Sequence, residues 1–416
     1  MTTVLNGKIR VLDLSMGWAG PMVGQMMAEL GAEVVKVEDT DHFDWWRGSL
    51  SVAPPEMQPI ERSAPFNTAN RGKLGVTLDL QDPRGVDLVK RLVAVSDMLI
   101  ENYSPGVMER FGLDYATLAA INPRLIMVSM PSFGSSGPEC NARGYGNTVE
   151  AMAGITGLMG YKDAEQRYTL SNALGDPVSG LHGTFGLLVA LHERERTGRG
   201  QLIELAQVEA LIPFVGTSIV ECQLTGKVPP PRGNSHPEHA PYGIYACVGD
   251  HGWIALACES DEQWQAAAHA LDLDNLADDA RFTRAADRKA NEYILNAELT
   301  RALGALQADD AVQRLLAVGV PAAPVNSAPA VIGDAHLAER GYFVAIDRAV
   351  VGTHLYPGGV ARLPETPLVA DQPAPLLGEH NADIFRRLLN LSDAEVAALE
   401  QEGIIGTAPR EYKKAS

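Results

Sequence analysis

A carboxylate at the expected start of a long helix is the side chain whose position most favours covalent chemistry. Asp176 lies between Gly175 and Pro177, and Asp followed by Pro is typical of a helix beginning with Asp as its N-cap. The free N–H groups and the dipole of a helix N-terminus favour an ionised, nucleophilic carboxylate. Small residues around it leave room for a bulky ligand: Ala173, Gly175, Ser179, Gly180 and Gly183. The alternative is a purely structural cap, and the tripeptide alone does not separate the two.

Cations in two other segments could bind phosphate groups. Arg71 and Lys73 flank Gly72 just before an expected strand, where backbone N–H groups and cations can form a cradle for phosphates. Arg143 precedes Gly144 and Tyr145 and could bring one more cation to the same cleft. A solvated charged loop is the alternative for the first segment, and the second is a weak signal by itself.

Several common site motifs are missing from the chain. It contains neither a Gly-x-x-x-x-Gly-Lys-Ser/Thr loop nor a dinucleotide-binding glycine fingerprint, so ATP and NAD are poorly supported. The Gly-x-Ser-x-Gly elbow of many hydrolases is also absent. His236 and His239 share a loop without a third ligand nearby, and the four cysteines form no Cys-x-x-Cys pair. We therefore expect no metal site, no permanently bound cofactor and four free thiols.

Charge and composition limit the partners of this chain. Its 416 residues include 34 basic and 52 acidic side chains, giving a net charge of −18, which argues against nucleic-acid or anionic-membrane binding. The start of the chain lacks the apolar core of a signal peptide. The apolar stretch 203–220 contains Glu204, Gln207 and Glu209, which argues against a membrane span. We expect a cytoplasmic protein without a membrane partner.

Strands and helices alternate along the first half of the chain. Short apolar runs at 8–14, 32–38, 97–101, 124–129 and 201–206 are typical of strands. Helical spacing of apolar residues predicts helices that begin near 20, 83, 115 and 176, each between two of these strands. Such alternation predicts an α/β domain with a mostly parallel sheet.

A change of composition near residue 225 predicts a domain boundary. A run of three prolines among polar residues is followed by two apolar stretches, 242–248 and 252–258, around a short Gly/Asp turn, which predicts a hairpin. Helices are expected at 261–271, 308–318 and 392–401. The predicted domains are 1–225, a large α/β domain, 226–325, a smaller α+β domain, and 326–416, a return segment that completes the large domain; the resemblance described next implies that the large domain binds CoA.

Ordered blocks along residues 7 to 405 resemble the family III coenzyme A transferases, the group that contains formyl-CoA transferase and carnitine-CoA transferase. The matching blocks are Val11-Leu-Asp-Leu14, Ala19-Gly-Pro21, Leu30-Gly-Ala-Glu-Val-Val-Lys-Val-Glu38, Asn70-Arg-Gly-Lys73, Glu101-Asn-Tyr-Ser-Pro-Gly-Val-Met108, Gly134-Ser-Ser-Gly-Pro138 and Thr197-Gly-Arg-Gly-Gln201. The resemblance implies a Rossmann-like large domain, a smaller α+β domain, and a homodimer whose two chains are interlocked.

The same resemblance implies an activity and a site. It implies transfer of CoA from an acyl-CoA donor to a carboxylic acid acceptor, with Asp176 attacking the thioester, forming a mixed anhydride and then an aspartyl-CoA thioester. Backbone N–H groups around Gly175 and Gly180 would hold the oxyanions. The family's CoA contacts map onto Trp18, Ala19, Ala69, Asn70, Arg71, Gly72, Asn102, Tyr103, Ser104, Arg110, Ala142, Arg143, Gly144 and Tyr145.

Three departures from the family pattern affect the expected substrate. Asp39 stands where an arginine is common, so Arg47 could take its place. Gly146 stands where formyl-CoA transferase has a glutamate, and the segment 232–239 replaces that enzyme's glycine-rich loop. The last two departures count against oxalate-type substrates. Trp45, Trp46, Phe66 and Tyr242 favour a larger acid unless they belong to the core.

Two other functions remain open at this point. This chain also resembles the α-methylacyl-CoA racemases. Those enzymes use two proton-transfer groups, a histidine at the position of Tyr145 and an aspartate at that of Asp176. A tyrosine, with an ordinary pKa near 10, does not replace that imidazole. The third possibility is a CoA-binding protein without turnover, against which the intact Asp176 argues.

Overall fold

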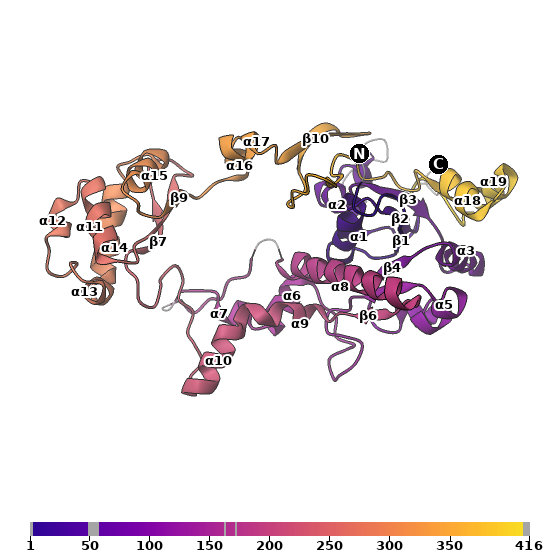
Figure 1. Ribbon diagram of the computed structural model, residues 1–416, viewed down its shortest axis with the longest axis horizontal. Coiled ribbons are helices and arrows are strands. Elements are labelled where there is room, and N and C mark those ends of the chain that lie inside the picture. Colours follow the sequence, from indigo (N-terminus) through magenta and orange to yellow (C-terminus); the bar gives the residue numbers. More distant parts are fainter. Residues whose placement is uncertain (1–2, 49–57, 162–163, 171–172, 411–416) are drawn as a thin grey trace. The chain divides into compact units, whose positions relative to one another are not determined.

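A parallel sheet of six strands forms the centre of the larger part of the chain (Figure 1). The computed structural model describes residues 3–48, 58–161, 164–170 and 173–410. The strand order is β3-β2-β1-β4-β5-β6, and each neighbouring pair is parallel. The strands are β1 (Arg10–Asp13), β2 (Glu33–Glu38), β3 (Lys73–Thr77), β4 (Met98–Glu101), β5 (Ile126–Ser129) and β6 (Leu202–Glu204). The predicted parallel α/β architecture is confirmed.

Helices cover both faces of this sheet. On one face, α1 (Ala19–Glu29) and α8 (Gly175–Thr197) form a core with the strands, which includes Val11, Val23 and Leu187. The other face is covered by α3 (Pro83–Ala94), α5 (Tyr115–Ile121), α18 (Asn381–Leu389) and α19 (Asp393–Gln401), with Leu12 and Phe385 in their shared core. Strands buried on both sides explain why these segments are continuous apolar runs in the sequence.

Connecting segments supply the remaining elements of this part of the chain. The helices are α2 (Ala64–Ala69), α4 (Val107–Arg110), α6 (Gly146–Met152), α7 (Ile155–Leu158), α9 (Gln207–Leu211) and α10 (Gly216–Thr225). The 3₁₀ turns are η1 (Trp45–Arg47), η4 (Pro59–Glu61) and η5 (Ile212–Val215). A two-stranded antiparallel ribbon follows later, formed by β10 (Phe343–Arg348) and β11 (Gly352–Pro357).

The smaller part of the chain is built on a three-stranded antiparallel sheet. Its order is β7 (Tyr242–Ala246), β8 (Trp253–Ala257) and β9 (Ala322–Pro324), and β7 with β8 forms the predicted hairpin. The helices are α11 (Asp261–Ala270), α12 (Asp274–Ala277), α13 (Ala285–Ala290), α14 (Glu292–Leu303), α15 (Ala308–Ala317), α16 (Ala328–Ile332) and α17 (Ala335–Glu339). Trp264 and Phe282 lie in its separate apolar core.

The chain thus divides into two compact units. Unit 1 contains 1–156, 169–227 and 341–416, and unit 2 contains 157–168 and 228–340. The domain ranges expected from the sequence, 1–225, 226–325 and 326–416, stay predictions, because compactness does not show that a range folds independently. Cys140, Cys222, Cys247 and Cys258 are free thiols, as expected.

One helical stretch of the described chain is unusually apolar and exposed. The residues from Gln207 to Thr225 are long and apolar enough to cross a membrane by length and composition alone. The stretch is interrupted by the turn η5 and carries Glu209 and Glu221. Its exposed apolar side chains are Ile212, Phe214, Ile219, Val220 and Leu224.

Candidate active site

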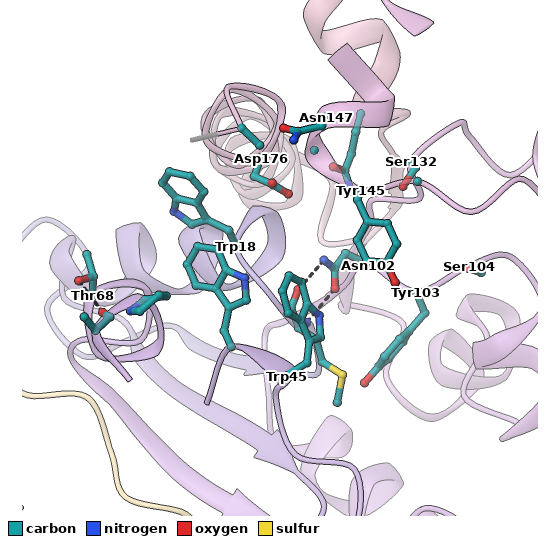
Figure 2. A pocket seen from close by; sticks show the side chains of 18 residues that line it. Trp18, Trp45, Thr68, Asn102, Tyr103, Ser104, Ser132, Tyr145, Asn147 and Asp176 are labelled. Carbon is teal, nitrogen blue, oxygen red and sulfur yellow. Dashed lines mark hydrogen bonds between the residues drawn. The ribbon is translucent and has the colours of Figure 1, made fainter. Parts of the chain in front are cut away.

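A cavity of about 770 Å³ opens where the loops after β1 and β4 meet (Figure 2). In a parallel sheet, ligands bind beyond the carboxyl ends of the strands, at the point where the strand order reverses. Here that point lies between β1 and β4. The cavity is lined by Met16, Trp18, Trp45, Trp46, Ala64, Pro65, Thr68, Asn102, Tyr103, Ser104, Ser132, Gly144, Tyr145, Gly146, Asn147, Ala173, Asp176 and Gln207.

Asp176 carries the ionisable carboxyl group of this cavity. Of the lining residues that the structure describes, it is the one Asp or Glu, and none is Lys, Arg, His or Cys. The side chain extends from the first turn of α8 toward the cavity (Figure 2). A carboxylate that has no cation beside it remains available for attack on a bound electrophile.

The beginning of α8 differs in detail from the sequence-based expectation. The helix starts at Gly175, its N-cap residue is Leu174, and no side chain caps it, so Asp176 is the second helical residue and not the cap. Gly180 lies inside the helix, where its N–H bonds back along the helix, so it is not an oxyanion donor. Asp176 therefore makes no capping bond, and the alternative that it is a purely structural helix cap no longer applies.

Glycines allow α8 to approach α1 closely. A Cβ atom at Gly180 would lie 3.0 Å from Met22 Cβ, and one at Gly183 would lie 2.9 Å from Val23 Cγ2. This approach brings the start of α8 to the start of α1, where the Ala19 N–H donates a hydrogen bond to Asp176. The small residues noted in the sequence thus serve helix packing as well as ligand space.

Gly146 also lies against the Asp176 carboxylate. A Cβ atom at this position would be 2.7 Å from Asp176 Oδ2 and 2.1 Å from Ala173 Cβ. These distances are too short for any side chain. The Gly146 backbone therefore packs directly against Ala173 and the Asp176 carboxylate, at the position where the resemblance implies a glutamate in formyl-CoA transferase.

Burial and a second carboxyl group raise the pKa of Asp176. Partial burial is the larger cause, and the nearby Glu150 adds to it, so the pKa of Asp176 is raised to about 6, although the Ala19 N–H acts in the opposite direction. The expectation that the helix N-terminus lowers this pKa is wrong in direction. Glu150 is fully buried. Its Oε1 accepts the Leu174 N–H, and its Oε2 has no partner among the described residues.

Three tryptophans and a tyrosine form an aromatic wall around the cavity. The ring centres of Trp18 and Trp46 are 5.3 Å apart, those of Trp45 and Trp46 are 6.0 Å apart, and those of Trp45 and Tyr145 are 6.4 Å apart. Gly17 has a φ of +77°, and a Cβ atom there would lie 2.6 Å from the Trp45 ring. Trp45 thus packs on bare backbone, which fixes its position.

A buried ion pair holds this wall in place. Lys36, on β2, donates to Asp44 Oδ2 at 3.0 Å and to the Ser15 carbonyl. Asp44 Oδ1 in turn accepts the N–H groups of Gly17 at 2.9 Å and Trp46 at 3.0 Å. Burial opposes the charge on Lys36, but Asp44, Asp13 and Glu38 outweigh it and raise its pKa. The pair is hydrogen-bonded to Ser15 and Gly17 on one side and to Trp46 on the other. It therefore connects the loops that carry Trp18 and Trp46.

Asn102 connects the two loops that form the floor of the cavity. Its Oδ1 accepts the Met16 N–H at 2.9 Å, and its Nδ2 donates to the Met16 carbonyl at 2.8 Å (Figure 2). A bidentate pair of this kind fixes both the spacing and the orientation of the loops after β1 and β4. Sequence reasoning had assigned Asn102 to CoA contact alone.

A second, smaller cavity of about 360 Å³ shares one wall with the first. The two cavities have Asn102, Tyr103, Ser104, Ser132, Gly144 and Tyr145 in common. Arg143, Ala142, Cys140 and Pro105 belong to the smaller cavity. Arg143 is exposed and has no ion pair within the residues that the structure describes. Its guanidinium is therefore available for an anion.

Eight of the fourteen expected CoA contacts line these cavities: Trp18, Asn102, Tyr103, Ser104, Ala142, Arg143, Gly144 and Tyr145. Ala19 is not part of either cavity lining, but its N–H stabilises the ionised form of Asp176. Ala69, Asn70, Arg71 and Gly72 are not part of either cavity lining, whereas their neighbours Ala64, Pro65 and Thr68 are. Arg110 ends α4, is exposed, and lines neither cavity.

Two arginines that were expected near CoA serve the fold instead. Arg71 donates to the carbonyls of Pro357 at 2.6 Å and Ala370 at 3.3 Å and pairs with Glu29. Arg47 is fully buried between Glu38 and Glu61 and lies 3.6 Å from the centre of the Phe66 ring. Buried and paired guanidiniums do not reach a phosphate group, so Arg47 does not replace the missing arginine at Asp39.

Several residues of the site were missed by sequence reasoning, among them Met16, Ala64 and Pro65 of the cavity lining. Ser132, Asn147 and Gln207 line the cavity, and Glu150 lies buried near Asp176. Phe66 is buried beneath Arg47, and Tyr242 belongs to unit 2, so neither contributes to the lining described. Asn147 and Glu150 could have been found from the sequence, because both lie in the helix that directly follows the expected site residue Tyr145.

Comparison with known proteins defines the class: residues 5–381 match the sequence model of CoA-transferase family III. The chain is 33% identical over 402 residues to succinyl-CoA–D-citramalate CoA-transferase of Chloroflexus aurantiacus, covering 95% of this chain and 97% of that protein. It is 31% identical to succinate–glutarate CoA-transferase of Agrobacterium fabrum, covering 91% and 94%.

A solved structure agrees with these sequence relatives. A CAIB/BAIF family protein from Brucella suis matches with a TM-score of 0.84 and 35% identity, over 93% of this chain and all of that one. The chain therefore belongs to CoA-transferase family III and is a CoA-transferase that acts between carboxylic acids. The predicted family and enzyme class are confirmed.

Proposed function

We propose that this enzyme transfers CoA through covalent intermediates on Asp176. The observation that carries the proposal is that Asp176 provides the carboxyl group of a large cavity whose described lining holds no other Asp or Glu and no cation. The reacting thioester would lie in the cavity beside Asp176, where Tyr145, Gly146 and Asn147 also belong to the lining. Attack by a held carboxylate on a bound thioester gains from proximity and orientation.

The proposed steps conserve atoms and charge. Asp176 Oδ attacks the thioester carbonyl of the donor acyl-CoA, the C–S bond breaks, and CoA leaves as a thiolate from a mixed anhydride. The thiolate attacks the aspartyl carbonyl and releases the donor acid as a carboxylate, leaving an aspartyl-CoA thioester. The acceptor carboxylate attacks the carbonyl of this thioester, the aspartyl C–S bond breaks, and CoA leaves as a thiolate from a second mixed anhydride. The thiolate then attacks the acceptor's carbonyl, which gives the new acyl-CoA and regenerates Asp176.

CoA itself would extend through the smaller cavity. Arg143 is the unpaired cation of that cavity, and the shared wall at Asn102, Tyr103 and Ser104 connects it to Asp176. A phosphate group beside an exposed arginine gains a charge-assisted hydrogen bond. The thioester end would then reach Asp176 through the larger cavity. CoA enters as part of the substrate, and we propose no permanently bound cofactor.

Neither alternative function is favoured by a specific observation. A racemase needs two proton-transfer groups on opposite faces of the α-carbon, and the described cavity lining offers Asp176 without a histidine. A non-catalytic CoA carrier would not need a carboxylate in the thioester path. The relatives reported above are named succinyl-CoA–D-citramalate CoA-transferase and succinate–glutarate CoA-transferase, and exchange of CoA between acids is the activity that we assign to Asp176 here.

We propose further that the protein is a cytoplasmic homodimer. The exposed apolar side chains of α10 and η5, including Phe214, Val220 and Leu224, form a surface that a second copy would cover. Sedimentation equilibrium measures this directly, because a dimer has twice the 44.5 kDa mass of the chain.

Replacing Asp176 with asparagine tests the assigned role. Asparagine keeps the shape of the side chain but is not a carboxylate nucleophile, so we expect CoA transfer to fall by about a thousandfold or more. Because Asp176 makes no capping bond, thermal unfolding and the affinity for CoA should stay near the wild-type values. Transfer within about tenfold of wild type would remove Asp176 from the mechanism.

A further inference from the structure

We propose that Lys73 is a positioning residue for Asp176, acting through its ion pair with Asp13 and through the start of α1. This inference rests on the proposed function, because it takes Asp176 as the nucleophile. Lys73 was expected from the sequence to bind phosphate groups, but the structure encloses its side chain completely. Burying an ammonium group is costly unless the group is paired and hydrogen-bonded, so its partners indicate what it does.

The amino group of Lys73 uses all three of its N–H donors within the chain. It donates to Asp13 Oδ2 at 2.7 Å, to the Pro21 carbonyl at 2.7 Å and to Asn70 Oδ1 at 2.8 Å. Lys73 lies on β3 and Asp13 on β1, with β2 between them. Pro21 belongs to the first turn of α1, and Asn70 ends α2. One ammonium group therefore fixes two strands and two helices relative to one another.

Helix α1 packs directly on this ion pair. A Cβ atom at Gly24 would lie 2.6 Å from Asp13 Oδ2 and 3.0 Å from Lys73 Nζ, so no side chain fits between the helix and the pair. At the start of the same helix, the Ala19 N–H donates to Asp176. The side chains of Lys73 and Asp13 have no exposed area in the single chain, so a second copy in a dimer does not reach them.

Asp13 extends the same constraint to the loop after β1. Its Oδ1 accepts the Ser15 N–H at 3.0 Å and also the Ser15 hydroxyl. A Cβ atom at Gly20, in the first turn of α1, would lie 2.2 Å from Ser15 Cβ. The loop and the helix are thus fixed against each other on both sides of Trp18, which lines the cavity.

The hydrogen bond from Ala19 gives this arrangement a measurable effect on Asp176. Burial and, to a smaller extent, Glu150 raise the pKa of Asp176 to about 6, and the Ala19 N–H opposes them by stabilising the carboxylate. If α1 moves away from the ion pair, this bond weakens, the pKa rises further, and less of the nucleophile is ionised at low pH. Of the described residues around Asp176, Glu150 is charged and the lining residues Tyr103 and Tyr145 are titratable. All three are kept in the variants that test the proposal.

Lys73 is charged in the pH range in which Asp176 titrates. Burial lowers the pKa of Lys73 to about 8; Asp13 and, more weakly, Asp44 oppose this fall, and Lys36 adds to it. Because Asp176 has a pKa of about 6, Lys73 remains protonated where the carboxyl group ionises. The ion pair is therefore intact across the acid limb of the reaction.

The direct test replaces both members of the pair by neutral side chains. The double variant Asp13→Asn/Lys73→Met leaves no charge unpaired and keeps the net charge, so a shift does not come from a lost cation. We expect kcat/KM to fall by about tenfold and its acid limb to move up by about half a pH unit. An acid limb at the wild-type pH would overturn the proposal, because a merely structural pair lowers stability without changing the pKa of Asp176.

A second buried ion pair provides the matched control. Arg194, in the last turn of α8, pairs with Asp97 at 3.0 Å, at the opposite end of the helix from Asp176. The double variant Asp97→Asn/Arg194→Met removes this pair and should leave the acid limb at the wild-type pH. An equal shift in this control would contradict a specific role of Lys73.

Gly24→Ala tests the same contact with both charges in place. The added methyl group would push α1 away from Asp13 and Lys73, whereas alanine favours the helix itself. We expect the acid limb to move in the same direction as in the double variant. In the control Gly186→Ala, on α8, a Cβ atom would meet only the Ile203 side chain, at 3.3 Å. An unchanged acid limb in Gly24→Ala would overturn the proposal even if the double variant did not fold.

Failure of this inference differs from failure of the proposed function. If Asp176→Asn is inactive and the acid limb stays in place in Gly24→Ala, Asp176 remains the nucleophile and Lys73 has only a structural role. If Asp176→Asn transfers CoA like the wild type, Asp176 is not the nucleophile and both proposals are overturned.

Discussion

At the scale of single residues, the site pairs a half-buried Asp176 with a fully buried Glu150. The pKa of Asp176 is raised to about 6 by its burial and by the charge of Glu150. The ionised nucleophile is therefore less stable than a carboxylate in water and more reactive once it forms. Glu150 also holds the Leu174 N–H just before α8, which makes it a positioning residue for the nucleophile.

Glu150→Gln should shift the pH dependence of the reaction. Glutamine keeps an oxygen for the Leu174 N–H but removes the negative charge, so the pKa of Asp176 falls. A larger fraction of Asp176 is then ionised at low pH, and the acid limb of kcat/KM should move to lower pH. We expect about threefold higher relative activity near pH 5. The control is Glu195→Gln, because Glu195 is exposed on α8, the helix that carries Asp176. An unchanged acid limb would show that Glu150 does not act on Asp176.

Arg143 and Arg71 should respond differently to the same substitution. Arg143→Gln removes an exposed cation that has no ion pair among the described residues, and it should raise KM for acyl-CoA about fivefold with little change in kcat, since a phosphate contact persists through the reaction. Arg71→Gln breaks bonds to Pro357 and Ala370 and should lower the melting temperature instead. Arg362→Gln, on the exposed surface, is the control. A collapse of kcat in Arg143→Gln with unchanged KM would contradict a phosphate contact.

At the scale of elements, the active site depends on how closely α8 packs on α1. Gly180 and Gly183 face Met22 and Val23 at distances that admit no larger residue without movement. Because this packing sets the distance between the start of α8 and the loop after β1, it sets the position of Asp176 relative to Trp18. A small displacement of a nucleophile lowers the rate strongly.

Gly180→Val tests this packing. The added methyl groups would meet Met22 and the Ala19 carbonyl, so we expect a loss of about 1–3 kcal/mol in the free energy of unfolding and about a tenfold loss in kcat/KM. Gly186→Val lies on the same helix, where a Cβ atom would meet only the flexible Ile203 at 3.3 Å, and it controls for the change in helix propensity. Equal effects of the two substitutions would exclude a specific role of the α1–α8 contact.

The sequence was sufficient for these elements but not for their contacts. The period of apolar residues predicted α8 and its neighbouring strands, because local spacing alone produces that pattern. The apolar spacing did not reveal that Arg71 bonds to the carbonyls of Pro357 and Ala370, which are 286 and 299 positions away in the sequence. It also did not reveal that Gly146 contacts Asp176. Such contacts depend on the assembled fold. The N-cap was placed at Asp176, whereas it is Leu174. The direction of the Asp176 pKa shift was reversed, because the burial of this carboxyl group and, to a smaller extent, its proximity to Glu150 arise only in the assembled fold.

At the scale of the whole molecule, a six-stranded sheet brings many separate segments of the chain to one cavity. The lining comes from the loops after β1, β4 and β5, from η1 and α2, and from α6, α8 and α9. The buried Lys36–Asp44 pair and the Asn102–Met16 bonds connect these segments. The cavity is therefore a property of the assembled sheet, which is why family membership predicts the reaction class well and the acid poorly.

The measurement that tests the central claim most directly is chemical trapping of Asp176. The enzyme is incubated with acyl-CoA, treated with borohydride or hydroxylamine, and digested, and the peptide that contains Asp176 is analysed by mass spectrometry. Covalent transfer predicts a reduced or hydroxamate-modified Asp176 that is absent without acyl-CoA, and no rapid uptake of deuterium at the acyl α-carbon in deuterated water. An unmodified Asp176 together with fast α-carbon exchange would contradict the proposal and indicate proton transfer.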